Sequence, residues 1–198
     1  DLVVTSPGWR PDQPLLAAAA AAGIPVWGEV ELAWRMRPEH GGAPWLAVTG
    51  TNGKTTTVQM LTSILRAAGL RACSAGNVGT PILEAVVHPD PFDVIAVELS
   101  SFQLHWSHSL APQASVCLNV APDHVDWHGS LEEYALAKGK VYANTEVACI
   151  YNVQDERTRR LVEQAEVQEG CRAIGFTLGI PGPSELGVVD DVLADRAF

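Results

Sequence analysis

Val48-Thr49-Gly50-Thr51-Asn52-Gly53-Lys54-Thr55-Thr56-Thr57 is the stretch that decides the fold of this 198-residue chain. It follows the apolar run 45–49, which predicts a strand, and it leads into 54–68, where apolar residues recur at helical spacing. A strand, a glycine-rich loop and a helix in this order form a phosphate-binding loop, because glycines let backbone N–H groups turn around phosphate oxygens. The stretch therefore predicts a nucleoside triphosphate site, and the alternative is a Gly-Lys pair in a surface turn.

The general pattern of such loops, G-x-x-x-x-G-K-[ST], has a glycine where this chain has Val48. The rest of the pattern is present. Lys54 brings a positive charge, and the hydroxyl of Thr55 is placed to coordinate magnesium. The strand predicted at 94–99 carries Glu98 near its carboxyl end, where the acid of a P-loop fold holds the metal. The alternative is a solvated glutamate at a sheet edge.

Short apolar runs alternate with segments of helical period, which is typical of an α/β fold with a mostly parallel sheet flanked by helices. The expected strands are 2–5, 25–27, 45–49, 71–74, 94–99, 114–120, 147–151 and 172–176, with a hairpin strand at 188–193, and the expected helices are 13–22, 30–36, 54–68, 131–142 and 156–168. The segment 37–44 is polar and rich in Gly and Pro. It predicts a linker between a short N-terminal piece and a nucleotide-binding domain that starts near residue 45.

Composition and charge exclude several classes of protein. A chain with 47% hydrophobic and 18% charged residues is not disordered, collagen-like or a coiled coil. The net charge of −10 argues against nucleic-acid binding, and no apolar run approaches the roughly 20 residues of a membrane helix. The four cysteines include no C-x-x-C pair, which favours a reducing compartment, the cytoplasm. No signal peptide is visible, and we expect Asp1 to be a cut end.

Four side chains able to bind metal follow the strand predicted at 114–120: Asp123, His124, Asp126 and His128. The two histidines have the spacing of a zinc pair on a helix. Pro122 and Gly129 bracket the segment, however, and predict a loop rather than one helix face. Oxygen-rich ligands with one imidazole favour magnesium instead.

Other polar residues have ordinary explanations. The pair His105 and His108 is predicted to lie at the surface or to cap a helix. Ser100 is expected to cap the next segment or to contact phosphate. From the pattern alone, Lys138 and Lys140 place favourable charge near the C-terminus of the helix 131–142.

Taken together, five motifs resemble the Mur ligase family in order and spacing: 50–55, Gly76-Asn77-Val78-Gly79, Glu98-Leu99-Ser100-Ser101-Phe102-Gln103-Leu104, 119–126 and Ala137-Lys138. The resemblance runs from Ser6-Pro7-Gly8 onward and weakens after Gly175. Within the family, the Ser-Ser-Phe-Gln-Leu and Gly-Asn-Val-Gly stretches are most similar to the branch that adds D-glutamate. Another amino-acid ligase of the family is the alternative.

The resemblance implies an ATP-dependent amide ligase of peptidoglycan biosynthesis that joins D-glutamate to UDP-N-acetylmuramoyl-L-alanine through an acyl phosphate. It implies small-molecule partners only, a monomer, ATP and two magnesium ions, the second one held by a carbamylated lysine. The resemblance implies that ATP is bound by Gly50, Thr51, Asn52, Gly53, Lys54, Thr55 and Thr56. It assigns catalysis to Lys54, Glu98, His124 and Lys138, and metal binding to Thr55, Glu98, His124 and Lys138. It assigns substrate binding to Asn77, Ser100, Gln103 and His124.

The family has three domains, and the resemblance implies that this chain holds parts of two. Residues 1–38 are expected to be a remnant of a Rossmann-like UDP-binding domain, and 45–198 an incomplete ATP-binding domain. The amino-acid-binding domain is expected to be absent, so the chain alone is not expected to be a competent ligase. Two other functions stay open: a P-loop ATPase acting as a switch, which the metal-binding residues argue against, and a non-catalytic module that binds a nucleotide sugar.

Overall fold

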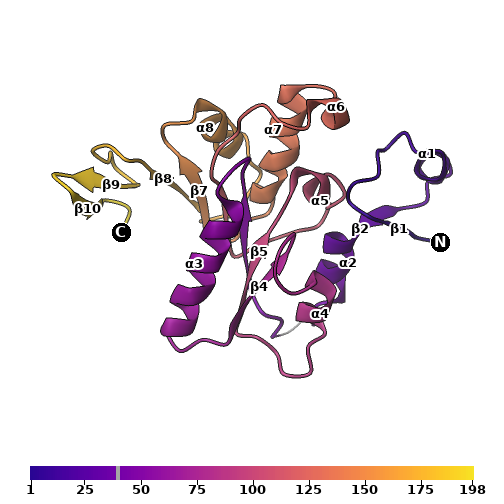
Figure 1. The fold of residues 1–198 in the computed structure, drawn as a ribbon, viewed down its shortest axis with the longest axis horizontal. Helices are drawn as coiled ribbons and strands as arrows, with labels where there is room; N and C mark the ends of the chain where they lie inside the picture. Colours follow the sequence, from indigo (N-terminus) through magenta and orange to yellow (C-terminus); the bar gives the residue numbers. More distant parts are fainter. Residues whose placement is uncertain (39–40) are drawn as a thin grey trace.

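The computed structural model describes residues 1–38 and 41–198, and its centre is a sheet with strand order β10-β9-β8-β7-β6-β3-β5-β4 (Figure 1). The strands are β3 Trp45–Thr49, β4 Ala72–Gly76, β5 Val94–Glu98, β6 Ala114–Cys117, β7 Ala148–Asn152, β8 Arg172–Phe176, β9 Glu185–Val189 and β10 Val192–Asp195. Neighbouring strands are parallel, except β9 and β10. The predicted α/β fold is confirmed.

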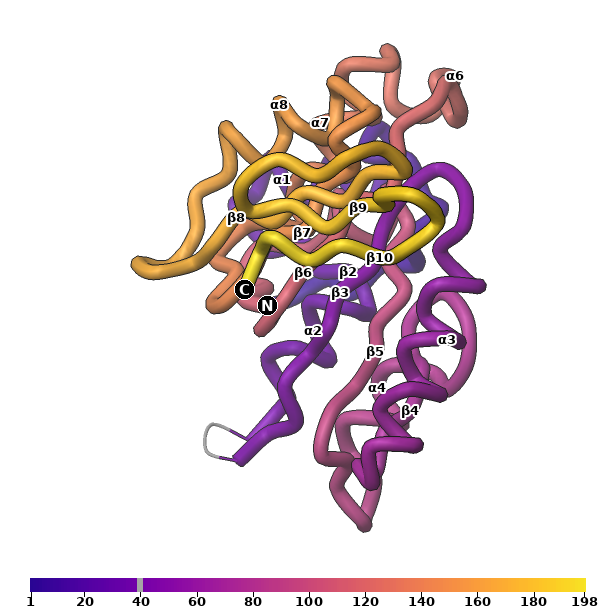
Figure 2. Tube along the Cα trace, turned by 90° about the vertical axis from the view of Figure 1, so that its left-hand side faces the viewer, coloured from indigo at the N-terminus to yellow at the C-terminus, as the bar shows by residue number. Residues whose placement is uncertain are grey.

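Helices cover both faces of this sheet: α3 Lys54–Ala67, α4 Ile82–Val86, α5 Ser101–His105, α6 Val125–His128, α7 Leu131–Gly139, the short 3₁₀ helix η1 Lys140–Tyr142 and α8 Glu156–Glu163. On one face, Val58 of α3 packs on Val48 and Ala96. The alternate strand residues Ala47 and Val97 face the larger core on the other side. Figure 2 shows α3 on one side of β3 and β5, with α2 on the other.

The N-terminal piece forms a small unit of its own strands and helices. β1 Val3–Thr5 pairs in parallel with β2 Val26–Gly28, and α1 Pro14–Ala21 connects them. The next helix, α2 Glu29–Met36, leaves this unit and buries Val30 and Ala33 completely in the core of the large sheet. Figure 1 shows the N-terminal piece and the β9–β10 hairpin at opposite ends of the molecule.

Several expected elements differ from the observed ones. The strand expected at 114–120 ends at Cys117, because the side chain of Asn119 leaves the sheet to exchange hydrogen bonds with the backbone of Asn52. The strand expected at 188–193 is a hairpin of two strands that turns at Asp190 and Asp191, both with positive φ. The helix expected at 131–142 ends as α-helix at Gly139 and continues as η1.

The segment after His124 also differs from expectation. It was predicted to be a loop, but Val125–His128 forms one helical turn, α6, so this prediction is wrong. The turn begins after His124 (φ 49°) and ends at Gly129 (φ 90°), and both residues have positive φ. The whole turn therefore fits between Pro122 and Gly129, the residues on which the prediction of a loop rested. The short helix α4 was not predicted.

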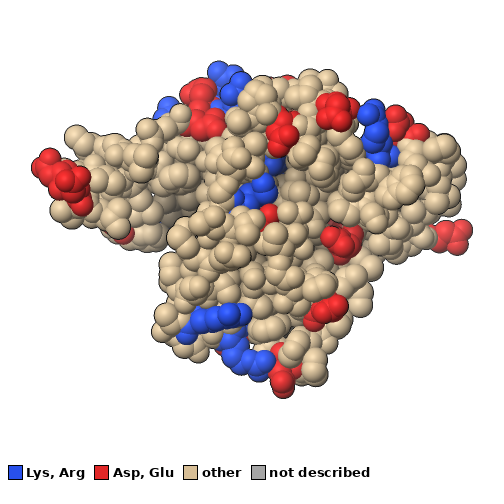
Figure 3. Space-filling model, in the orientation of Figure 1, with Lys and Arg blue, Asp and Glu red and all other residues tan. Residues whose placement is uncertain are grey.

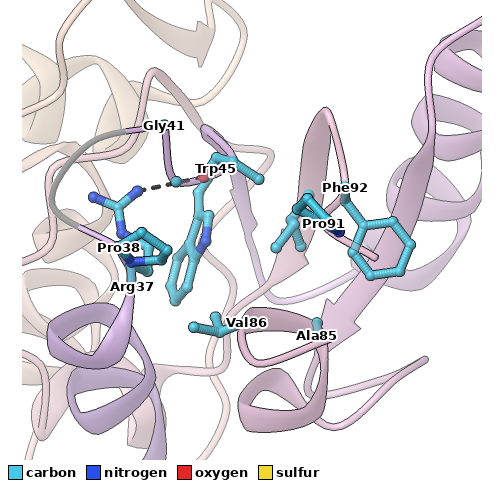
Figure 4. Close-up of a pocket in the computed structure, with 11 residues that line it drawn as sticks. Arg37, Pro38, Gly41, Trp45, Ala85, Val86, Pro91 and Phe92 are labelled. Atoms are coloured by element: carbon cyan, nitrogen blue, oxygen red, sulfur yellow. Dashed lines mark hydrogen bonds between the residues drawn. The ribbon is translucent and has the colours of Figure 1, made fainter. Parts of the chain in front are cut away.

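A cavity of about 40 Å³ lies where β3 and β5 begin, at the opposite end of these strands from the glycine-rich loop. Figure 4 shows the indole of Trp45 between Arg37 and the side chains of Val86 and Pro91. The Arg37 guanidinium lies 3.3 Å from the Trp34 ring centroid. The cavity adjoins the linker predicted at 37–44, of which residues 39 and 40 lie outside the described part of the chain.

Within the described ranges, no helix has both the length and the apolar character that crossing a membrane requires.

Candidate active site

The glycine-rich loop lies at the carboxyl end of β3, the strand between β5 and β6. Open α/β sheets bind ligands at this edge, where successive connections leave in opposite directions. Gly53 has φ 82°, a left-handed conformation that turns the chain into α3. The backbone N–H groups of 53–56 have no acceptor among the described residues. They form a cradle of free donors at a helix N-terminus, which suits phosphate.

Contacts with the segment that follows β6 and with helix α7 fix the shape of the loop. Asn119 accepts from the Asn52 N–H at 2.9 Å and donates to the Asn52 carbonyl at 3.1 Å. The Thr51 hydroxyl contacts the hydroxyl of Tyr134 at 3.1 Å and accepts from the Ala121 N–H at 3.0 Å. These contacts fix the backbone of the loop and leave the N–H groups of 53–56 available to a ligand. The motif comparison did not identify Tyr134, because it lies 83 residues from Thr51 in the chain.

Lys54 and Lys138 donate to one carbonyl oxygen. Each places its Nζ 2.8 Å from the Gly50 oxygen, and Lys54 also lies 3.0 Å from the Thr51 oxygen. Lys138 is 2% exposed. Burial, and then the charge of Lys54, lower the pKa of Lys138 to about 8, so the neutral amine is accessible near physiological pH.

Glu98, at the end of β5, lies beside the loop. Its carboxylate is 1% exposed and accepts from the Thr55 hydroxyl and from the Asn77 amide, each at 2.9 Å. The Asn77 N–H donates to the Glu98 carbonyl at 2.9 Å. This close approach depends on Gly76, where a Cβ would overlap the Glu98 carbonyl oxygen. The structure therefore brings together three residues that the sequence assigned to metal and substrate binding.

Hard oxygen donors of this kind suit magnesium, which often keeps several water ligands and takes one or two carboxylates. The Thr55 hydroxyl is already adjacent to the buried Glu98 carboxylate, so the two groups fit a magnesium ion beside the phosphate cradle. In the described part of the chain, no three His, Cys, Asp or Glu side chains gather as a metal site.

His124 lies next to Tyr134, the residue whose hydroxyl contacts the loop at Thr51. Its ring packs 4.8 Å from Phe102 and 6.2 Å from Tyr134, and its Nε2 lies 3.4 Å from Asp123. Lys138 Nζ lies 4.6 Å from the same Tyr134 ring. His124 and Lys138 therefore both lie near one aromatic ring, although the His124 side chain is about half exposed and Lys138 is buried.

His128 joins this group, although the sequence comparison gave it no role. Its Nε2 lies 3.0 Å from the Ser101 hydroxyl, and its ring stacks in parallel on Phe102. Burial, and then the charge of His105, lower the pKa of His128 to about 4. Burial likewise lowers the pKa of His105, the half-buried last residue of α5, to about 4. His108 is exposed, as predicted.

Ser100 and Gln103 form the N-terminal cap of α5. The Ser100 hydroxyl accepts from the Gln103 N–H at 3.1 Å, and the Gln103 side chain accepts from the Ser100 N–H at 2.9 Å. The Gln103 amide also donates to Glu29 of α2 at 3.0 Å. The predicted capping role of Ser100 is confirmed. Substrate contact by either residue stays a prediction.

The charges on the face in Figure 3 fit this arrangement. Lys and Arg atoms lie in a hollow near the middle of this face, and acidic groups lie both beside this hollow and around the outline. The chain as a whole is acidic, with a net charge of −10. An anionic ligand would thus be held by a local concentration of lysine and backbone donors.

The model of the Mur ligase middle domain matches residues 48–181. The chain is 64% identical over its whole length to UDP-N-acetylmuramoylalanine–D-glutamate ligase of Streptomyces avermitilis and 56% identical to that of Thermobifida fusca. It spans 42% of each of these proteins. Among solved structures, a UDP-N-acetylmuramoyl-L-alanyl-D-glutamate–2,6-diaminopimelate ligase matches with a TM-score of 0.65 at 20% identity, over 96% of this chain and 48% of that one. This last likeness concerns the fold.

Proposed function

The chain belongs to the Mur ligase family, and from this premise we propose that it forms the ATP-binding part of a ligase that adds D-glutamate to UDP-N-acetylmuramoyl-L-alanine. The observation that carries the proposal is the site itself: Lys54, Lys138, Thr55 and Glu98 meet at one phosphate cradle. Support for D-glutamate comes from the relatives that bear this activity in their names. Because the chain spans 42% of them, we propose the activity for a protein of their full length.

In the proposed reaction, a carboxylate oxygen of the nucleotide sugar attacks the γ-phosphorus of ATP and ADP leaves. The amine of D-glutamate then attacks the acyl carbon, and phosphate leaves as the amide bond forms. Negative charge concentrates where these anions meet. The free N–H groups of 53–56 bind phosphate oxygens, and Lys54 exchanges the carbonyls of Gly50 and Thr51 for the β- and γ-phosphates.

Magnesium, when bound, neutralises charge on the phosphates and on the transferred group. Thr55 and Glu98 would hold the first ion, since their side-chain oxygens lie 2.9 Å apart beside the free N–H groups of the loop. His124 and Lys138 would hold the second, since both lie next to Tyr134. Asn77 keeps its hydrogen bond to Glu98 and orients the carboxylate, and we assign it a further contact to the nucleotide sugar.

Lys138 needs a chemical change to act as a metal ligand, because an ammonium group cannot coordinate a cation. We assign that change to carbon dioxide. The neutral Nζ attacks the carbon of CO₂, an N–C bond forms, and the nitrogen loses one proton to give an anionic carbamate. The pKa of about 8 makes the neutral amine available. The carbamate would also remove the repulsion between Lys138 and Lys54.

The nucleotide sugar is assigned to the N-terminal piece. A hollow of about 590 Å³ is lined there by Ser6, Gly8, Trp9, Arg10, Asp12, Gln13 and Pro14. Arg10 supplies a positive charge for a diphosphate. We divide the chain as expected from the sequence: 1–38 as a remnant of the nucleotide-sugar domain and 45–198 as the ATP domain. The proposed enzyme is a cytoplasmic monomer.

A nucleotide-release assay tests the proposal. The complete polypeptide should release ADP only when both UDP-N-acetylmuramoyl-L-alanine and D-glutamate are present, and Lys54→Ala should abolish release. Strict dependence on another amino acid would identify a different ligase of the family. Release without any acceptor would identify an ATPase switch and contradict the proposal. The chain 1–198 alone should be inactive, and D-glutamate-dependent ADP release by it would contradict the proposed domain division.

A further inference from the structure

Trp127 joins the N-terminal piece to the helical turn that follows His124. Its indole Nε1 donates to the carbonyl of Gly8 at 3.1 Å. A second hydrogen bond runs in the opposite direction, from Arg10 Nη1 to the carbonyl of Asp126 at 3.0 Å. These partners are 119 and 116 residues apart in the chain. The loop that lines the N-terminal hollow is thus attached to α6 at two points.

The ring of Trp127 is also the centre of an aromatic cluster. Its centroid lies 5.0 Å from Phe102, 5.0 Å from His105 and 4.5 Å from His128. Phe102 in turn packs 4.8 Å from His124. One side chain therefore contacts the N-terminal loop through its N–H group and supports the surroundings of His124 through its ring. Packed aromatic groups transmit displacement because the interior is close-packed.

We propose that Trp127 is a positioning residue that couples the placement of the N-terminal loop to the placement of His124. Its hydrogen bond holds residues 6–14 against α6, and its ring holds Phe102 under His124. The consequence for catalysis rests on the proposed function: the nucleotide sugar on the loop and the phosphates at Lys54 are kept at a fixed separation, which favours the reaction of two bound groups.

Amide hydrogen exchange on the chain 1–198 tests the coupling without any assay of activity. In Trp127→Phe the ring remains but the hydrogen bond is lost, so exchange of residues 6–14 should become about 2- to 10-fold faster, the range expected for one neutral hydrogen bond. Exchange in α3 should not change. Unchanged exchange of the loop would overturn the proposal.

Trp106→Phe is the matched control. Trp106 lies in the same cluster, 4.8 Å from His105, and its indole N–H is buried with no partner among the described residues. This variant deletes an indole N–H group that makes no hydrogen bond, so exchange of residues 6–14 should match that of the unaltered chain. Equal acceleration in both variants would overturn the proposal, because the effect would then come from ring volume.

A measurement on the unaltered chain guards against misfolding of the variants. The indole N–H of Trp127 should exchange more slowly with solvent than that of Trp9, which is 54% exposed. Equal rates would mean that the bond to Gly8 does not form and would overturn the proposal.

The complete enzyme provides the catalytic readout. Trp127→Phe should raise KM for the nucleotide sugar about 2- to 10-fold and leave KM for ATP unchanged. Equal effects on both KM values would overturn the coupling. If neither the unaltered enzyme nor Trp127→Phe shows D-glutamate-dependent turnover, the proposed function fails. The hydrogen-exchange results on residues 6–14 then still decide the role of Trp127.

Discussion

Two lysines and one buried carboxylate set the electrostatics of the candidate site. Lys54 and Lys138 converge on the Gly50 oxygen, a neutral acceptor that cannot compensate two charges. Glu98 makes its hydrogen bonds to Thr55 and Asn77 instead. The lowered pKa of Lys138 follows directly from this arrangement, since burial and a neighbouring cation both disfavour its ammonium form.

The first prediction concerns carbamylation of Lys138. With ¹³C-labelled bicarbonate and magnesium, the chain should give a carbamate carbon signal in NMR spectra that is absent in Lys138→Arg. At constant dissolved CO₂ the signal should grow as pH rises through about 8, because only the neutral amine reacts. Lys140→Arg is the control: its ammonium donates to the His105 carbonyl, so this variant should keep the signal. A signal that persists in Lys138→Arg would contradict the assignment.

At the scale of elements, the ends of β4 and β5 place Asn77 against Glu98. Gly76 pairs with Glu98 in the register of these strands and has φ 101°. A side chain there meets two obstacles, the left-handed backbone and the carbonyl oxygen of Glu98. Backbone cannot move aside as easily as a flexible side chain. The position of the carboxylate therefore depends on a glycine in the neighbouring strand.

The second prediction separates these two obstacles. Gly69 follows α3 with φ 88° and has open space around it, so Gly69→Ala should cost only backbone strain, about 1–2 kcal/mol. Gly76→Ala should lower the free energy of unfolding by about 1–3 kcal/mol more, because overlap with Glu98 is added. Urea unfolding of both variants measures the difference. Equal losses of unfolding free energy in the two variants would show that β4 and β5 move apart at no energetic cost.

At the scale of the whole molecule, α2 fastens the N-terminal piece to the large sheet. Its Glu31 is fully buried and accepts from the N–H groups of His108 and Ser109, from the Ser109 hydroxyl and from Arg35. Burial raises the pKa of Glu31, and these hydrogen bonds together outweigh burial, so the net pKa lies below the usual value. The folded state thus stabilises the charged form.

The third prediction tests this attachment. Glu31→Gln replaces one acceptor oxygen by an amide that faces donors, so the free energy of unfolding at pH 7 should fall by about 2–4 kcal/mol. Glu29→Gln, on the same helix, changes a carboxylate with a hydrogen bond from Gln103 and should cost about 1 kcal/mol or less. Chemical unfolding measures both. Equal losses would contradict an anchoring role specific to Glu31.

The pH dependence of Glu31→Gln follows from the sign of the pKa shift. A carboxyl group whose pKa is depressed by folding contributes stability above its unfolded pKa and loses it as pH falls through the folded pKa. The difference between Glu31→Gln and the unaltered chain should therefore shrink in acid. A difference that stays constant from neutral to acidic pH would show that packing alone is affected.

The sequence alone determined the parts that depend on local pattern. The glycine-rich loop, Lys54, Thr55 and the strand that ends at Glu98 follow from periodicity and residue type over a few turns of chain, and the alternation of elements predicts the α/β fold. The one-turn helix after His124 was missed, because Pro122 and Gly129 bracket only a few residues and local signals fix element boundaries poorly.

Only the tertiary structure decided which distant side chains meet. The order of strands brings Lys138 to Gly50 across 88 residues and Trp127 to Gly8 across 119. Local propensity carries no information about such pairs, since each residue alone has an ordinary explanation, a helix C-terminus for Lys138 and a loop aromatic for Trp127. Burial lowers the pKa of Lys138, and a hydrogen bond to Gly8 places the Trp127 N–H group; both are properties of the packed molecule.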